Sequence, residues 1–200
     1  MTMTKHTMMT VVKTLVATLV VVLLALGAFI YSGVYYVGAD RDDAAMMTTM
    51  VHQTMMRSVA ARTDDVAVPK DFNDPAMAAM GAMHYKSMCV ACHLAPGVDS
   101  SEMRMGLNPK PPKLAAIADN LDPRFIFWVI KHGVRMTAMP AWGKSHDDEA
   151  IWAMTAFIKN ELPTMTPAEF DRIMPEEEGE NAHEHRHGAH GHEHQEEVTP

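Results

Sequence analysis

The hydrophobic pattern begins with a charge-free apolar run over residues 14–37, preceded by a polar stretch that holds Lys5 and Lys13. As a helix, this run would measure ~36 Å at ~1.5 Å per residue, enough to cross a hydrocarbon core of roughly 30 Å. Lysines precede the run and acidic residues dominate after it. The positive-inside rule therefore predicts that residues 1–13 are cytoplasmic and that the rest of the chain lies outside.

Two interpretations of this run are open. The first is a retained single-pass anchor, with Tyr31, Tyr35 and Tyr36 at the outer interface, where aromatic side chains gather. The second is a cleaved signal peptide, although the apolar stretch is longer than a usual signal core and no clear A-x-A site follows it. The length of the run favours the anchor.

Beyond the run, apolar positions follow helical spacing, and no stretch alternates as a β-strand would. Apolar side chains at every fourth position predict a helix over residues 44–62, within a juxtamembrane segment of residues 38–75. Pro69, Asn73 and Pro75 disfavour regular structure, so this segment is expected to end in a linker. The apolar stripe of the helix consists of Met47, Val51, Met55 and Val59, widened by Met46 and Met50.

Residues 76–170 are expected to form one small helical domain, which makes the predicted fold class all-α. Pro123 at the first position and Gly133 at the end are sound boundary signals for one of its helices. Three helices are expected, with a proline-rich loop after the first: residues 76–88, the loop 106–112, residues 122–132, and a last helix from Ser145 or Asp147 to about residue 160.

The C-terminal tail, residues 171–200, is acidic, low in complexity and expected to be disordered. It holds most of the acidic excess behind the formal net charge of −8, so the preceding domain is close to neutral. A near-neutral domain argues against nucleic-acid binding, which requires a basic face. The tail also holds half of the chain's histidines, namely His183, His185, His187, His190, His192 and His194.

Cys89, Cys92 and His93 form a C-x-x-C-H motif, and the two cysteines are the only ones in the chain. Such a pair can be a thiol redox couple, half of a zinc site or the attachment point of a c-type haem. For haem, the two thiols would add to two vinyl groups of one porphyrin, and the adjacent imidazole would reach the iron. A thiol redox couple is expected to follow a strand, whereas a helix is predicted before the motif here.

Met139 is the candidate for a second axial ligand. It precedes Pro140, which prevents a helix from continuing and leaves the methionine on irregular backbone after a helix end. The chain has 20 methionines, and most are expected to be packing or surface residues, since methionine fills irregular gaps. Its position after the C-x-x-C-H motif distinguishes Met139 from the others.

The segment from about residue 75 to residue 162 resembles the class I c-type cytochromes. Gly81 and Tyr85 resemble that family's N-terminal helix, in which a small residue lets the C-terminal helix cross closely. The resemblance implies one covalent haem c in a cytochrome c-like fold, preceded here by a transmembrane helix. The matching face of the last helix would consist of Ile151, Trp152 and Phe157.

The resemblance also implies roles for individual residues. Cys89 and Cys92 would attach the haem, and His93 and Met139 would ligate the iron. The carbonyl of Pro112 resembles the one that accepts the N–H of the proximal imidazole in this family. Tyr85 and Trp128 are expected to pack against the haem or to orient the imidazole, while His84 and His132 are expected to be surface or helix-end residues.

Histidine and methionine together fill both axial positions and raise the haem potential relative to two nitrogen ligands. Such a haem suits electron transfer and leaves no open position for a substrate, so no enzyme activity of its own is expected. The anchor implies a location in a bacterial inner membrane, with the haem domain in the periplasm. Its expected partners are membrane-bound redox donors and acceptors, and Lys110, Lys113, Lys131 and Arg135 are hypothesised to steer them.

Metal handling is the alternative function. Imidazole binds zinc and copper, so the histidines of the tail could hold either ion, or the tail could be merely solvated. Thioethers suit cuprous ion, and the juxtamembrane helix is rich in them. The side chains concerned in that helix are Met46, Met50, His52, Met55 and Met56.

Overall fold

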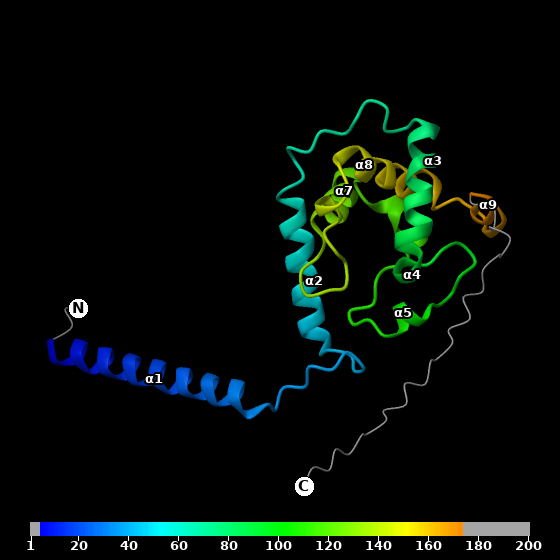
Figure 1. Ribbon diagram of the computed structural model, residues 1–200. Helices are drawn as coiled ribbons and strands as arrows, with labels where there is room; N and C mark the ends of the chain where they lie inside the picture. Colours follow the sequence, from blue (N-terminus) through cyan, green and yellow to red (C-terminus); the bar gives the residue numbers. More distant parts are fainter. Residues whose placement is uncertain (1–4, 174–200) are drawn as a thin grey trace, which may run out of the picture.

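A computed structural model describes residues 5–173 of the chain (Figure 1). Every regular element within these residues is helical, and none of them forms a strand. The all-α fold class is therefore confirmed. A long helix precedes a group of shorter helices that pack around one hydrophobic core.

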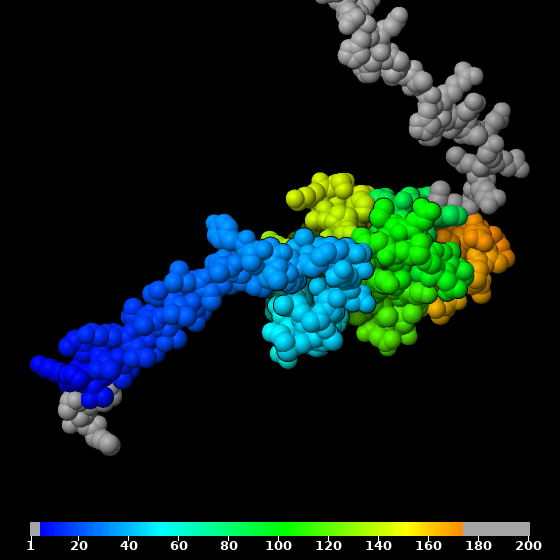
Figure 2. Space-filling model, turned by 90° about the horizontal axis from the view of Figure 1, so that it is seen from below, coloured from blue at the N-terminus to red at the C-terminus, as the bar shows by residue number. Residues whose placement is uncertain are grey.

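Helix α1 (Lys5–Ser32) is long and apolar enough to cross a membrane and buries none of its residues. Figure 2 shows it standing clear of the helical domain as a rod. The helix begins at Lys5, before the charge-free run, and ends at Ser32, before the last apolar residues of that run. Gly33, with φ +64°, accounts for the early end, because a left-handed residue terminates a helix.

Helix α2 (Ala45–Ala60) matches the helix expected over residues 44–62, but its stripe is buried only near its C-terminal end. Val59 is buried and Met55 is half-buried, whereas Met47 and Val51 are exposed. The helix packs against α7. The N-terminal half of the stripe is therefore exposed within the described residues.

Helices α3 (Pro75–His84) and α8 (Asp148–Ala156) cross at the centre of the domain. A Cβ atom at Gly81 would overlap the backbone carbonyl of Ala153, so only glycine allows this close approach. Each helix then continues into a π-helical turn, η1 (Tyr85–Cys89) after α3 and η4 (Phe157–Glu161) after α8. The small residue expected at this crossing is thus observed at Gly81.

Helix α7 (Pro123–His132) has the boundaries expected from its sequence. The carboxylate of Asp122 accepts the backbone N–H of Arg124, Pro123 is the first helical residue, and Gly133 follows the last. On its inner face, Phe127 stacks against Trp152 of α8 with 4.2 Å between ring centroids. This contact joins α7 to the α3–α8 pair.

The remaining elements are short and were not expected individually from the sequence. They lie in the connections between the longer helices and after the last of them. They are α4 (Val90–His93), α5 (Glu102–Met105), α6 (Leu114–Ile117), η2 (Ala118–Asn120), η3 (Trp142–Lys144) and α9 (Pro167–Arg172).

We predict that Gly81→Ala destabilises the domain by about 3 kcal/mol or more, because overpacking typically costs 1–3 kcal/mol and here the obstacle is backbone. Denaturant unfolding followed by circular dichroism measures this free energy. Gly106→Ala is the matched control, since a Cβ there would lie 3.8 Å from the nearest atom, the carbonyl oxygen of Met103. Equal stability of the two variants would contradict the crossing described here.

Candidate functional site

The C-x-x-C-H motif lies directly after the α3–α8 crossing. Cys89 ends η1, and the four-residue helix α4 carries the motif on to His93. Leu94 then leaves the helix with φ +65°, an uncommon conformation for a branched residue. The chain therefore turns sharply at the imidazole, and His93 faces the proline-rich loop that follows.

His93 is oriented by one hydrogen bond, in which its Nδ1 lies 2.9 Å from the carbonyl oxygen of Pro112. Since a carbonyl can only accept, Nδ1 carries the proton and Nε2 keeps its lone pair. Desolvation lowers the pKa of His93, against the opposing effect of this hydrogen bond, while the Arg104 charge lowers it further. A neutral imidazole with a free Nε2 is the form that ligates a metal.

Cys89 and Cys92 are both half-buried and form no disulfide. Burial, followed by the charge of Cys92, raises the pKa of the Cys89 thiol to about 12. A thiol redox couple needs a thiol with a lowered pKa, since the thiolate is the nucleophile. This environment therefore disfavours the redox-couple interpretation of the motif.

Tyr85 is fully buried, and its hydroxyl donates to the carbonyl oxygen of Leu94 at 2.7 Å. Its ring packs against Phe157 and Phe170, from η4 and α9. Burial raises the pKa of Tyr85 far above its usual range, so the hydroxyl remains a donor. Tyr85 thus fixes the turn that directly follows His93.

Met139 lies on a tight loop whose backbone is hydrogen-bonded on both sides of the residue. Its N–H donates to Oγ1 of Thr137 at 3.1 Å, and its carbonyl accepts the N–H of Val134 at 3.2 Å. The Thr137 hydroxyl in turn donates to the carbonyl of Val134 at 2.7 Å. Met139 is half-buried and packs against the same hydrophobic core as Cys89.

Gly133 enables this loop to return over the end of α7. Its φ is +67°, and a Cβ there would lie 2.8 Å from the carbonyl oxygen of Met139. The neighbouring Met136 has φ +62° and is 85% exposed, so its side chain points away from the core. Of these two methionines, Met139 is the one that the loop directs inward.

The aromatic residues occupy different positions relative to this site. Trp128 is half-buried, and its ring lies against His132, with 4.6 Å between centroids. It does not join the core cluster, so its expected role against the haem stays a prediction. Trp142, which directly follows the Met139 loop, does pack against that cluster.

The chemistry of these side chains fits a haem c. The set offers two thiols for thioether bonds, a free imidazole nitrogen and a soft thioether sulfur. Arg104 adds a further donor, since its Nη2 donates to Pro111 while its buried Nε has no hydrogen-bond partner in the described part of the chain. That donor suits an anionic group such as a haem carboxylate. It could not be identified from the sequence, because nothing in the pattern predicts that a surface-type arginine is half-buried.

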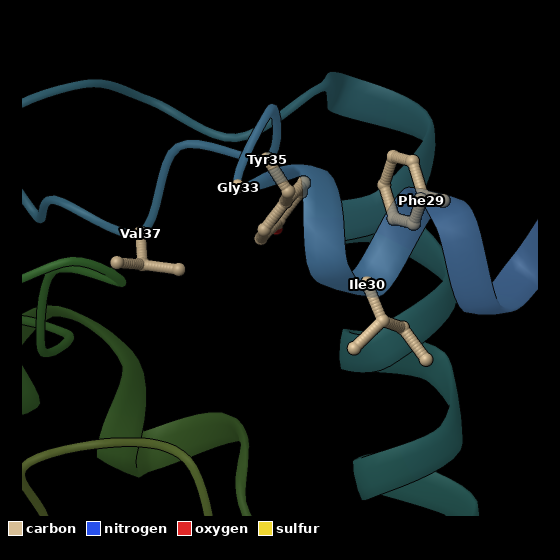
Figure 3. Close-up of a pocket in the computed structure, with 5 residues that line it drawn as sticks. All are labelled: Phe29, Ile30, Gly33, Tyr35 and Val37. Carbon is tan, nitrogen blue, oxygen red and sulfur yellow. The ribbon is translucent and has the colours of Figure 1, made fainter.

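Two other features of the described residues were tested as sites. Figure 3 shows an apolar hollow at the end of α1, lined by residues from Phe29 to Val37. The ring centroids of Phe29 and Tyr35 are 6.4 Å apart. Apart from the Tyr35 phenol, the lining of the hollow is apolar, which suits the edge of a membrane. Within residues 5–173, no three His, Cys, Asp or Glu side chains are placed to hold a metal ion. The six tail histidines lie outside the described residues.

Comparisons with known proteins give one match. Residues 76–158 match the model of a protein family described as cytochrome C oxidase, cbb3-type, subunit III. The matched segment contains the C-x-x-C-H motif, the proline-rich loop and Met139. No curated protein and no solved structure matches the chain.

We predict that Tyr85→Phe destabilises the protein by ~1–3 kcal/mol, because it leaves the buried carbonyl of Leu94 without a donor. Tyr36→Phe is the control, since that exposed hydroxyl bonds only to Asp40 and its loss should stay within about ±0.5 kcal/mol. Denaturant unfolding measures both. A Tyr85→Phe variant as stable as the control would show that the turn after His93 does not need this hydrogen bond.

Proposed function

Because residues 76–158 are a monohaem c-type cytochrome domain, we propose that the chain transfers electrons between membrane-bound redox partners on the periplasmic side of a bacterial inner membrane. The observation that carries the proposal is the hydrogen bond between His93 Nδ1 and the Pro112 carbonyl, 2.9 Å long. It presents Nε2 as a ligand beside two free thiols. No catalytic residue is assigned, and the chain is proposed to have no enzyme activity of its own.

Haem c supplies a reversible one-electron couple when it is bound. In this proposal Cys89 and Cys92 would hold the haem covalently, and His93 and Met139 would ligate its iron. The contribution of the chain is then to hold the ligating side chains in place. Pro112 orients the imidazole, and the Thr137 hydroxyl holds the backbone N–H of the methionine.

Ligation by both His93 and Met139 supports a carrier over an enzyme. With His93 and Met139 both holding the iron, a substrate would have no vacant position on it. The methionine backbone is hydrogen-bonded at its N–H and at its carbonyl, which favours a fixed thioether over a labile one. Reorganisation on electron transfer is then small, as outer-sphere transfer requires.

The membrane proposal rests on α1, which meets the length and hydropathy needed for a span and buries none of its residues in the described chain. With Lys5 and Lys13 in its N-terminal part, the positive-inside rule favours a periplasmic haem domain. Such an anchor would confine the domain to the membrane surface. Integral membrane donors and acceptors are therefore the proposed partners.

The cations hypothesised to steer those partners are partly neutralised within the domain. Lys131 pairs with Asp148 at 2.6 Å, and Lys113 pairs with Asp99 at 3.4 Å. Lys110 and Arg135, by contrast, make no ion pair among the described residues. Steering by this surface is accordingly proposed to be weak, because a paired charge contributes little to the long-range field.

We predict that Met139→Ala abolishes the weak sulfur-to-iron absorption band at the red edge of the ferric spectrum. The midpoint potential should fall by about 0.1 V or more, within the ~0.8 V range that axial ligands span. Redox titration followed by absorption measures both effects. Met136→Ala is the matched control, since Met136 is 85% exposed and should retain the band and the potential. A band that survives in Met139→Ala would place the second ligand elsewhere.

We predict that Arg104→Gln lowers the midpoint potential by roughly 50 mV, about 1 kcal/mol, because removing a half-buried positive charge favours the ferric state. Lys110→Gln is the control, since Lys110 is exposed and solvent screens its charge. The same redox titration measures both variants. If Arg104→Gln and Lys110→Gln have the same potential, the guanidinium does not act on the haem.

A further inference from the structure

Two histidines outside the haem site meet where α3 and α8 come together. His84 is the last residue of α3, and His146 precedes Asp147, the N-cap of α8. Their rings are 5.4 Å apart between centroids and nearly perpendicular, at 82°. Both side chains are half-buried. Neither has a role in the proposed electron transfer.

Hydrogen bonding does not account for this pairing. Among residues 5–173 no hydrogen bond joins the two rings, and the one bond to either ring is between His146 Nδ1 and Oγ of Ser145, at 2.9 Å. If Nδ1 donates its proton to that hydroxyl, Nε2 of His146 is left with a free lone pair. The ring of His84 has no hydrogen-bond partner among the described residues, so one of its ring nitrogens is also available to ligate a metal ion.

The spacing of the rings suits two imidazoles bound to one metal ion. Zinc–nitrogen bonds measure about 2.0–2.1 Å, so tetrahedral ligation by two imidazoles separates their centroids by roughly 5.2 Å. The observed 5.4 Å is close to that value. The Ser145 hydroxyl would then hold His146 as an outer partner commonly holds a metal-ligating histidine.

We propose that His84 and His146 form a two-histidine site for a divalent transition-metal ion of the zinc and copper class. Imidazole nitrogen favours these ions over magnesium or calcium, which prefer oxygen ligands. No third His, Cys, Asp or Glu completes the set within the described residues. Water or a soluble ligand fills the other positions, so the ion exchanges freely.

The position of the site gives the metal a structural consequence. His84 lies on the helix that leads to Cys89, and His146 lies on the segment that follows the Met139 loop. A bound ion therefore ties the motif side of the domain to the loop side, next to Trp142, whose ring lies 5.5 Å from that of His146. Metal binding raises thermal stability by mass action, since only the folded chain brings the two rings together.

The test uses the full-length haem protein, with the six tail histidines changed to alanine so that the tail cannot bind the probe. Zn²⁺ is titrated by calorimetry. We expect one ion per chain, and at least a tenfold loss of affinity in His84→Ala and in His146→Ala. The double variant should lose no more than either single variant, because one ligand alone cannot hold the ion.

His132→Ala is the matched control, since that ring lies against Trp128. It should bind Zn²⁺ with unchanged affinity. His84→Asn and His146→Gln provide milder replacements, and the haem spectrum reports whether each variant is folded. Electron paramagnetic resonance with Cu²⁺ should show two ligating nitrogens in the background protein and fewer in each variant.

Two results would overturn the proposal. One is the absence of zinc binding in the background protein, which would make the ring contact a packing feature only. The other is unchanged zinc affinity in folded His84→Ala and His146→Ala, which would place the ion on other histidines such as the exposed His52. Neither result affects the proposed haem function, because His93 and Met139 do not take part.

Discussion

The close approach of α3 and α8 at Gly81 is the constraint on which the site depends. A side chain at that position would meet the backbone of Ala153, so neither rotamer changes nor repacking could relieve the clash. Helix α3 leads into the cysteines and His93, whereas α8 begins directly after the Met139 loop and its short η3 turn. The crossing therefore sets the distance between the elements that carry the two proposed axial ligands.

The local backbone conformation at Leu94 and at Gly133 orients the segments that carry the two proposed ligands. On the motif side, Leu94 adopts a positive φ that is sustained by the buried Tyr85 hydroxyl and frees His93 to face Pro112. On the loop side, Gly133 adopts a positive φ, and the next residue, Val134, donates its N–H to the carbonyl of Met139. In both cases a backbone segment with a positive φ is held by specific hydrogen bonds, so the chain itself fixes the backbone that carries each proposed ligand.

The features predictable from the sequence are those with local signals. Asp122, Pro123 and Gly133 delimit α7 because capping and helix termination depend on adjacent residues. Gly81, Pro112 and the Met139 loop were suggested by resemblance, and the structure provides a physical reason for each position. The exposed half of the α2 stripe, the buried Nε of Arg104 and the His84–His146 contact were not predicted. Periodicity does not show which face finds a partner, and contacts between distant segments leave no local pattern.

The juxtamembrane segment connects the proposed anchor to the haem domain more directly than a free linker would. The side-chain amide of Asn108 donates to the carbonyl of Arg41 at 2.7 Å, which ties the exit from α1 to the proline-rich loop. That loop also contains Pro111 and Pro112, the acceptors for Arg104 and His93. Twelve residues separate α1 from α2 and could span at most about 40 Å when extended, but this contact shortens their reach. The proposed anchor and the proposed ligand His93 are therefore linked through the same loop, because Asn108 contacts the exit from α1 and Pro112 orients the imidazole.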